Sequence, residues 1–571
     1  MQPYYDIVSR QVKLLEENNF QSRNEIYSYA LKVIDEHIKE SLNGDHFAHL
    51  VYQKKLLEEA LICLEKSYSN SGGVEYDLDT KPEIRTNISS LDNQRISKNK
   101  IFLSNIATSG AVSIFKAVLQ LVMLPVMARL LTPSDYGLYA LALPTVLFFV
   151  LLADGGLGLS LSREDEGNIT VWSTAFWALF AICLIMACFV AASGFLLSWL
   201  ADQPSLVGIM SLLSLSLPIL AFMVPADARL IRRGNLVYHS LSDLCGSFLG
   251  AGVAVFLAYK GAGAWSLAFQ YVVSFAFRAI VLNVAGWVRP SFVFKGSSLG
   301  NHFKIASSII FSRMSELFGK LSENYIFENL FQLNTLGSYN MANQVSRFSC
   351  ESIVNPLIGS FYAHILHQND EDTQRIHLNI LKLLLCFLFP IVLFVSIAGE
   401  EFYVLTLGEK WRKSYLYFQI IASPYSLMAI SWFSLQVLLK KGIVNRSTKL
   451  SIIYSFVRVL LVCTGIFWSA TIVIALIAFS YVLQAISALL IVPRDVGANR
   501  LDLLSFVWLP MTFTIALSSI LYVVVEYYGG SLFIDFLSLS VGFIIYIALL
   551  WIFCFEYFKD ELKSLRHFFH R

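Results

Sequence analysis

The chain contains 571 residues, of which 56% are hydrophobic and only 15% are charged, and its formal net charge is +2. This composition, with a mean hydropathy of +0.60, exceeds what one soluble core can bury, so we expect lipid to solvate part of the chain. The near-neutral charge provides no basic surface for nucleic acid, which excludes that class of partner. The cysteines form no CxxC pair and no Cys/His cluster, so we expect no disulfide, no metal site and no cofactor.

The first hundred residues are polar and differ from the rest of the chain. They begin without the apolar core of a signal peptide. Residues 1–68 carry amphipathic patterns of helical period, for example at Ile26, Ala30 and Val33. Residues 69–100 are rich in Ser, Asn, Asp and Gly, which predicts a flexible linker. We therefore predict a soluble helical module, residues 1–68, on a cytoplasmic tether.

Beyond residue 101, apolar runs of about 20 residues alternate with short polar loops, and a helix of that length crosses the hydrocarbon core of a bilayer. The chain is therefore predicted to be an all-α polytopic membrane protein with about fourteen transmembrane helices. The predicted spans are 103–128, 137–158, 172–200, 205–224, 241–259, 263–285, 302–322, 334–364, 378–398, 414–438, 449–468, 471–492, 505–526 and 532–556.

Lys and Arg gather in alternate loops, which sets the predicted orientation because these residues favour the cytoplasmic side. They occur before the first span, in every second loop after it and in the C-terminal tail, with Arg229, Arg289, Lys440 and Lys559 among them. The pattern predicts an even number of spans and places both termini in the cytoplasm. The GEKWRK segment, residues 408–413, is an exception because it is basic in a loop predicted to lie outside.

An internal repeat relates the two halves of the membrane region. At an offset of 200 residues, Gly137 matches Gly337 and Tyr139 matches Tyr339. Both segments follow the first span of a six-span block, and parallel repeats of this kind are one transporter architecture, with substrate handled between the halves. We therefore predict an N-terminal lobe, a C-terminal lobe, and an additional helix pair with a cytoplasmic tail, at residues 101–290, 291–495 and 496–571.

The segment ARLLTPSDYGLYALALPTVLFFVLLADGGLGLSL resembles the opening signature of the Wzx-type polysaccharide flippases, in the multidrug/oligosaccharidyl-lipid/polysaccharide exporter superfamily. Further matches follow in family order, namely IRRGNLVYHSLSD, GAGAWSLAFQYV, NTLGSYNMANQVSR and LGEKW. The resemblance covers roughly residues 100–495 and leaves out the polar module.

The resemblance implies two six-helix lobes around a central cavity that opens alternately to each side of the membrane. It also implies a function, the transfer of a polyprenyl-pyrophosphate-linked oligosaccharide from the cytoplasmic to the outer leaflet of a bacterial inner membrane. The product would serve a surface polysaccharide such as O-antigen, capsule or exopolysaccharide. For the polar module two interpretations stay open, a solubilising extension and a docking site for a polysaccharide polymerase, a glycosyltransferase or a regulator.

Ionisable residues inside the predicted spans are the candidate substrate-binding residues, because a charge at bilayer depth costs about 3 kcal/mol or more and needs a partner or a cavity. The candidates are Lys116, Asp154, Arg278, Arg313, Glu316, Lys320, Glu323, Arg347 and Glu351. Cationic side chains in a water-filled cavity would replace part of the hydration of a pyrophosphate. The acidic residues would balance excess positive charge or carry a coupling proton.

Two interpretations of these charges stay open, pairing between helices and exposure to a cavity. The four candidates of the seventh span are spaced so that they share one helix face with alternating sign, which favours pairing. Lys116 has no acidic residue within one turn of its own helix, so its partner or ligand must come from elsewhere. Glu316, its counterpart at the 200-residue offset, is one possible partner across the lobes. Arg458 is a further cation within the eleventh predicted span.

Other functions compete with transport of a lipid-linked sugar. The chain has no HExxH or Walker A pattern, so we predict that it is not an enzyme, such as a membrane enzyme of polysaccharide assembly. A drug or cation exporter of the same superfamily is the closer alternative, and cations at cavity depth argue against it because they favour an anionic substrate. A scaffold that acts through the polar module is the third alternative.

Overall fold

A computed structural model of the chain describes residues 57, 112, 115–154, 157–162, 164, 168–233, 235–287, 289–293, 300–366, 368–441, 444–496 and 500–569. Only the backbone is described at 300–313, 315–316, 444–448, 490–496, 500–507 and 554–569, among other positions. The predicted module and linker, residues 1–68 and 69–100, lie outside the described residues apart from Leu57. The chain divides into two compact units, Met1–Asn99 and Lys100–Arg571, and the description below concerns the second.

The described part of the membrane unit is built from helices. In the N-terminal lobe the helical residues 115–130 are followed by α5 (Pro133–Asp154), α6 (Leu157–Leu161), α7 (Ile169–Leu200), α8 (Ser205–Ser214), α9 (Ser216–Arg232), α10 (Leu236–Tyr259) and α11 (Ala264–Gly286). In the C-terminal lobe the helices are α12 (Gly300–Phe331), α13 (Leu333–Ile365), α14 (Asp370–Leu383), α15 (Phe389–Ala398), α16 (Glu400–Leu407), α17 (Arg412–Lys440), α18 (Val444–Cys463) and α19 (Ala470–Val496). The chain then forms α20 (Arg500–Tyr528) and α21 (Leu532–Phe569).

The helices match the predicted spans and show that this is a multi-pass membrane protein. Ten spans in the described residues are long and apolar enough to cross a bilayer. The helices α12, α13 and α18 have the necessary length but are more polar, so the count of fourteen stays a prediction. The fourth predicted span, 205–224, corresponds to α8 and α9, which together run from Ser205 to Arg232. Hydropathy detects the apolar part of a helix, whereas the backbone hydrogen bonds continue into polar residues at its end.

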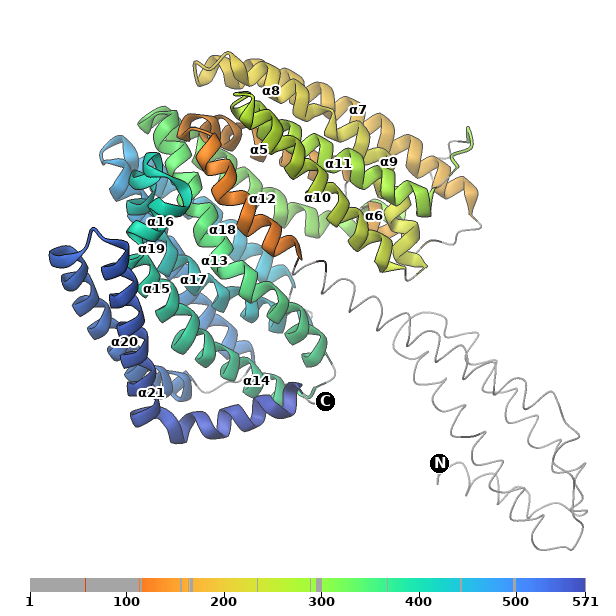
Figure 1. Cartoon of the computed structure of the whole chain (residues 1–571). Coiled ribbons are helices and arrows are strands. Elements are labelled where there is room, and N and C mark those ends of the chain that lie inside the picture. The colour runs from red at the N-terminus through yellow and green to blue at the C-terminus, as the bar shows by residue number, and fades with distance from the viewer. Residues whose placement is uncertain are drawn as a thin grey trace, which may run out of the picture. The chain divides into compact units, whose positions relative to one another are not determined.

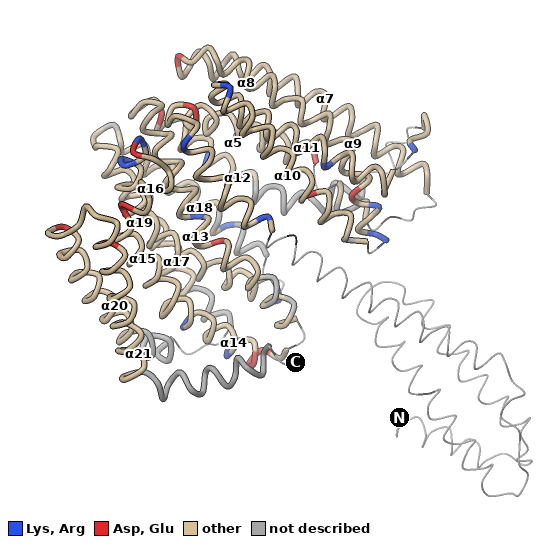
Figure 2. The backbone as a smooth tube through the Cα atoms, viewed as in Figure 1, with Lys and Arg blue, Asp and Glu red and all other residues tan. Residues whose placement is uncertain are grey.

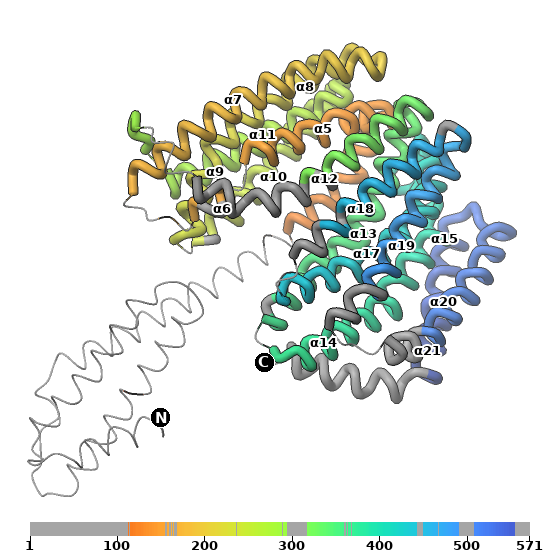
Figure 3. Tube along the Cα trace, turned by 180° about the vertical axis from the view of Figure 1, so that it is seen from behind, coloured from red at the N-terminus to blue at the C-terminus, as the bar shows by residue number. Residues whose placement is uncertain are grey.

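The helices gather into two groups, α5–α11 and α12–α19, as Figures 1 and 3 show from opposite sides. Within the first group α10 packs on α11, and α7 packs on α8 and α9. Within the second group α17 packs between α13 and α19, and α18 packs on α12. The groups meet where α5 contacts α12 and α13. The pair α20–α21 packs on α15, at the outside of the second group.

The repeated glycines lie at the junction of the two lobes. A Cβ atom at Gly137 would overlap the backbone oxygen of Leu333, and a Cβ at Gly337 would overlap the backbone oxygen of Pro133. Each glycine therefore faces the first turn of the helix from the other lobe, so α5 and α13 approach closely only because both lack a side chain. We call this end of the membrane unit, where α5 and α13 begin, the junction end.

Candidate functional site

Figure 2 shows that most charged residues lie toward helix ends, with a smaller set along the helices themselves. One such group lies in the N-terminal lobe and joins three helices. The ammonium of Lys116, on the first span, donates to Asp243 Oδ2 of α10 at 2.5 Å. Arg278 of α11 lies with its Nη1 atom 3.3 Å from Asp243 Oδ1. We call Lys116, Asp243 and Arg278 the N-lobe triad.

The N-lobe triad is partly exposed although it lies at span depth. Its side chains are 43%, 28% and 27% exposed for Lys116, Asp243 and Arg278. Ionised groups at bilayer depth almost always face the bundle interior or a water-filled cavity, so we expect the exposed parts of these side chains to face water. One carboxylate serves two cations, and the triad therefore carries a net positive charge toward that water. The Nε atom of Arg278 is buried and has no hydrogen-bond partner among the described residues.

A second pair lies beside the triad. His239 of α10 and Asp227 of α9 approach to 2.7 Å between Nδ1 and Oδ1. The charge of this pair depends on whether His239 is protonated.

The charges of the C-terminal lobe are arranged differently, around a buried carboxylate. Glu323 of α12 is only 1% exposed. Its Oε1 atom accepts from Lys320 Nζ at 2.6 Å and from the Tyr339 hydroxyl of α13 at 2.5 Å. The Lys320 ammonium also lies 4.9 Å from the centre of the Tyr339 ring. Lys320, Glu323 and Tyr339 therefore form a charged group with its partners in place, which we call the C-lobe lock.

Arg347 forms a third charged group, midway along α13. Its Nε atom lies 3.1 Å from Glu351 Oε1, one turn further along the helix. Glu351 also accepts from the Tyr425 hydroxyl of α17 at 2.6 Å. The Arg347 side chain is 59% exposed, so its outer part faces water by the argument used for the triad.

Contacts between the lobes close the junction end. Trp411, which is fully buried, donates through Nε1 to the Ala128 oxygen at 2.8 Å, and Lys410 donates to the Arg129 oxygen at 2.9 Å. In return Arg129 donates to the backbone oxygens of Leu405 and Thr406. Bonds therefore run in both directions between the end of the first span and the segment that follows α15.

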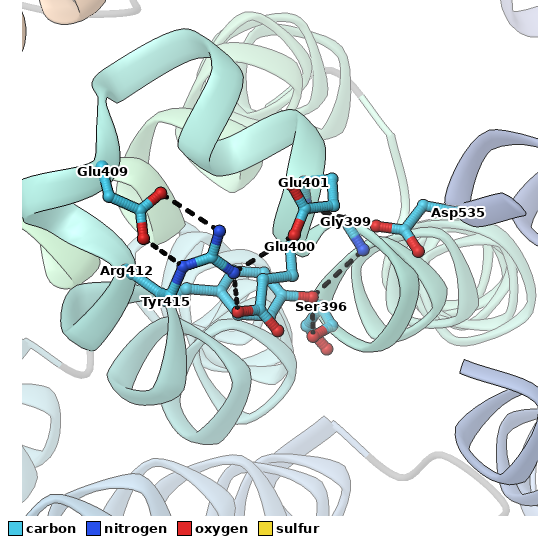
Figure 4. Close-up of polar contacts among 8 residues, drawn as sticks. All are labelled: Ser396, Gly399, Glu400, Glu401, Glu409, Arg412, Tyr415 and Asp535. Carbon is cyan, nitrogen blue, oxygen red and sulfur yellow. Dashed lines mark hydrogen bonds and ion pairs between the residues drawn. The ribbon is translucent and has the colours of Figure 1, made fainter. Parts of the chain in front are cut away.

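This segment also explains the basic loop that departs from the charge rule. Arg412 pairs with Glu409 at 2.6 Å and with Glu400 at 2.6 Å, and Glu401 lies 3.1 Å away (Figure 4). Asp535 of α21 accepts from the backbone N–H of Glu401 and so caps the first turn of α16. The positive charge of Arg412 is thus neutralised by three nearby carboxylates. The loop therefore carries less net positive charge than a count of its Lys and Arg residues indicates.

The chain matches a family described as polysaccharide biosynthesis proteins over residues 126–416. This protein belongs to that family. The sequence-based assignment to the polysaccharide flippases and their superfamily is thereby confirmed at the level of the family. The matched region contains Asp243 and Arg278 of the N-lobe triad and the whole C-lobe lock, whereas Lys116 lies before its first residue.

Two curated relatives and one solved structure extend the comparison. The succinoglycan biosynthesis transport protein ExoT of Rhizobium meliloti (strain 1021) is 24% identical over 296 residues, which cover 51% of this chain and 60% of ExoT. The lipopolysaccharide biosynthesis protein WzxC of Escherichia coli (strain K12) is 20% identical over 372 residues, covering 64% of this chain and 75% of WzxC. The chain thus spans less than two thirds of ExoT.

The fold is similar to that of the lipid II flippase MurJ in an inward closed conformation. The TM-score is 0.63 at 13% sequence identity, and the match covers 79% of this chain and 99% of the MurJ chain. The prediction of a two-lobed helical exporter fold is confirmed by this likeness. The family, the transport role named for ExoT and the flippase role named for MurJ agree with the prediction that this chain is not an enzyme.

Of the predicted site residues, the structure brings some together and leaves others apart. Lys116 and Arg278 meet on Asp243, while Lys320 pairs with Glu323 and Arg347 pairs with Glu351. Asp154 is the last residue of α5 and is partly buried. The side chains of Arg313 and Glu316 lie outside the described residues, so their part in the site stays a prediction.

The partner of Lys116 was missed, since the sequence-based candidate was Glu316 in the other lobe. Asp243 belongs to the same lobe and lies 127 positions away in the chain. It ends the motif IRRGNLVYHSLSD, which the resemblance had already singled out. The available signal was therefore an acidic residue about two turns into an apolar helix, next to the predicted span boundary at 241.

Proposed function

We propose that this protein is a flippase for lipid-linked oligosaccharides. It moves a polyprenyl-pyrophosphate-linked repeat unit from the cytoplasmic to the outer leaflet of a bacterial inner membrane, for O-antigen, capsule or exopolysaccharide. The family, the transport role named for ExoT and the MurJ-like fold all support this proposal.

The observation that carries the proposal is the net positive charge of the N-lobe triad. Lys116 and Arg278 share one carboxylate and keep part of their surface in water. A pyrophosphate arriving there would accept charge-assisted hydrogen bonds from both cations while Asp243 holds them in place. Such contacts offset the cost of removing the anion from bulk water. The same arrangement is unfavourable for a cationic drug, which disfavours the exporter alternative.

Transport then requires that the lobes change their contacts. The closed junction end, with Gly137 and Gly337 at its centre, must open for the headgroup to leave. The polyprenyl tail stays in lipid throughout, because the outer surfaces of the helices are apolar, with Phe195, Phe256 and Ile544 among the exposed side chains. The N-lobe triad would move relative to the C-terminal lobe during this change, whereas the C-lobe lock would stay intact.

The proposed orientation has both termini in the cytoplasm and the junction end outside. In a variant without native cysteines, Ser90→Cys and Leu565→Cys should react with a membrane-impermeant maleimide only in permeabilised cells. Pro204→Cys, in the loop after α7, should react in intact cells with a reagent that does not cross the membrane. Reaction of Leu565→Cys in intact cells would contradict an even number of spans.

The decisive experiment measures translocation in vesicles. Purified protein is reconstituted with lipid-linked oligosaccharide extracted from cells that lack it, and the fraction reached by a membrane-impermeant glycosidase is followed in time. Vesicles with the protein should expose inner-leaflet substrate faster than empty vesicles. An unchanged rate, in vesicles where the protein is folded, would reject the flippase function.

The corresponding test in cells is a clean deletion in a strain without a paralogue. We expect loss of the surface polysaccharide and accumulation of lipid-linked repeat units in the cytoplasmic leaflet. Normal surface polymer would contradict the proposal. An association of the polar module with a polymerase or glycosyltransferase remains a separate hypothesis, which a deletion of residues 1–68 would address.

A further inference from the structure

A hollow at the junction end lies between the lobes and has no role in the mechanism above. Its volume is about 590 Å³. It is lined by Ser134, Leu138, Leu200, Ala201, Asp202, Gln203, Glu328, Asn329, Gln332, Leu333 and Asn334. These residues come from α5 and the loop after α7 in one lobe, and from the α12–α13 turn in the other. Small-molecule sites commonly have about 300–1,000 Å³, so the volume is sufficient for a sugar.

One buried carboxylate oxygen in this hollow has no hydrogen-bond partner among the described residues. Glu328 is only 8% exposed, and its Oε2 atom is buried without a hydrogen-bond partner among the described residues. Buried polar atoms are normally paired, because an unpaired one loses its hydration without compensation. A ligand that donates a hydrogen bond to this carboxylate would supply the missing interaction.

The backbone is also strained at this hollow. Among the described residues, the non-glycine positions with left-handed φ are Asp202 at 50° and Gln332 at 70°. Both line the hollow, and one comes from each lobe. Strain of this kind concentrates at functional sites, where the surrounding structure holds a side chain in a required direction.

The polar groups identify the class of ligand. Gln203, Asn329, Gln332 and Asn334 present carboxamides that both donate and accept hydrogen bonds. The charged groups are the carboxylates of Glu328 and Asp202, and no Lys or Arg is among the residues that line the hollow. An anion such as pyrophosphate is therefore disfavoured, whereas sugar hydroxyls, which donate and accept, match the set.

We propose that this hollow is a saccharide site that binds sugar residues of the lipid-linked headgroup on the outer side of the membrane. The proposal rests on the proposed function for its orientation and for the source of the sugar. The two ends of one substrate are then recognised in different places, the phosphates by the cationic N-lobe triad and the sugars by the uncharged amides and the carboxylate of the hollow. Because both lobes line the site, a bound sugar changes the balance between its closed and open forms.

The test compares binding by full-length wild type, Glu328→Gln and the control Glu526→Gln, whose carboxylate is exposed on α20. The probes are lipid-linked oligosaccharide extracted from cells lacking the protein, and the water-soluble oligosaccharide released from it by mild acid. We expect wild type and Glu526→Gln to bind the soluble oligosaccharide, and Glu328→Gln to bind it about tenfold more weakly because the charged acceptor is lost. Equal binding by all three proteins, or no binding of the soluble probe, would overturn the saccharide site.

A second variant protects the test against misfolding. Asn334→Ala removes one exposed carboxamide at the rim and should also weaken binding, while melting temperatures identify any variant that is merely unstable. If Asn334→Ala and Glu328→Gln are both folded and both bind the oligosaccharide as the wild type does, the site is rejected. Vesicle translocation is measured in parallel. If Glu328→Gln binds the sugar more weakly but the wild type does not translocate, the saccharide site is kept and the flippase function is rejected. If the wild type translocates but Glu328→Gln binds the sugar as the wild type does, the flippase function is kept and the saccharide site is rejected.

Discussion

The two lobes hold their charges in opposite ways. In the N-terminal lobe one carboxylate, Asp243, serves two partly exposed cations. In the C-terminal lobe Glu323 is buried and accepts from both Lys320 and Tyr339. A partly exposed, cation-rich group can exchange partners at little cost, whereas breaking a buried pair leaves a charge without compensation. We therefore propose that the first group contacts the substrate and that the second holds its lobe together.

The largest effect is expected when the C-lobe lock is broken. Glu323→Ala leaves the Lys320 ammonium without its carboxylate, which should lower the free energy of unfolding by about 3–5 kcal/mol. Thermal and denaturant unfolding of the purified protein measures this loss. Glu351→Ala is the matched control, because its partner Arg347 is mostly exposed, and the expected loss of about 2 kcal/mol or less comes mainly from the Tyr425 hydroxyl that loses its acceptor.

The double variant Lys320→Ala with Glu323→Ala should recover part of the stability, because no charge then stays unpaired. If Glu323→Ala and Glu351→Ala destabilise the protein equally, the distinction between a buried lock and an exposed pair is wrong.

The next effect concerns transport rather than stability. Lys116→Ala should lower the translocation rate by about tenfold or more, equivalent to about 1.4 kcal/mol, because one of two phosphate donors is lost. Stability should change little, since Asp243 keeps Arg278 as its partner. Lys116→Arg should retain part of the activity, because the charge persists while the donor geometry changes. Vesicle assays and melting curves on the same preparations separate the two quantities.

Lys260→Ala, at the exposed end of α10, is the control and should leave transport unchanged. The contrary result would be that Lys116→Ala lowers the stability of the protein and that adding Asp243→Ala restores it. The N-lobe triad would then be a second lock, and the contrast between the lobes would disappear.

Much of the fold could be predicted from the sequence, because span length and loop charge report directly on the bilayer. The charge pairs within one helix were equally accessible, since Lys320 and Glu323 follow helical spacing. Asp243 and Tyr339 as partners could not be predicted in this way. Their contacts depend on how separate helices pack, and hydrophobic periodicity contains no information on which helix faces which.

The glycine contacts, in contrast, are the same in both lobes, because each glycine meets the first residue of the helix from the other lobe, and this leads to a third prediction. Gly337→Ala should prevent the close approach of α13 to Pro133 and so shift the junction end toward an open form. Gly252→Ala is the control, because a Cβ at that helical position meets open space, and alanine stabilises a helix by up to about 1 kcal/mol relative to glycine.

Spin labels at Lys260→Cys and Phe402→Cys, both exposed, report the separation of the lobes in a variant without native cysteines. Gly337→Ala should add longer distances and Gly252→Ala should not. Identical distance distributions in the two variants would show that the glycine contact does not limit closure.

The smallest effect is expected from the hydrogen bonds at the rim of the junction end. Lys410→Ala removes the bond to the Arg129 oxygen, but the bonds from Arg129 to Leu405 and Thr406 and from Trp411 to Ala128 remain. The loss of one such bond is worth on the order of 1 kcal/mol, or about fivefold in the ratio of closed to open forms. The same spin-label pair should therefore show a shift in populations without new distances.

Lys413→Ala provides the matched control, because this lysine lies in the same basic loop and is exposed. If the loop acts through its net positive charge, both lysine variants should shift the populations equally. If it acts through the hydrogen bond of Lys410 to the first span, only Lys410→Ala should do so. The second outcome is expected because charges at an exposed rim are screened by salt, whereas a hydrogen bond between the lobes has to break whenever they separate.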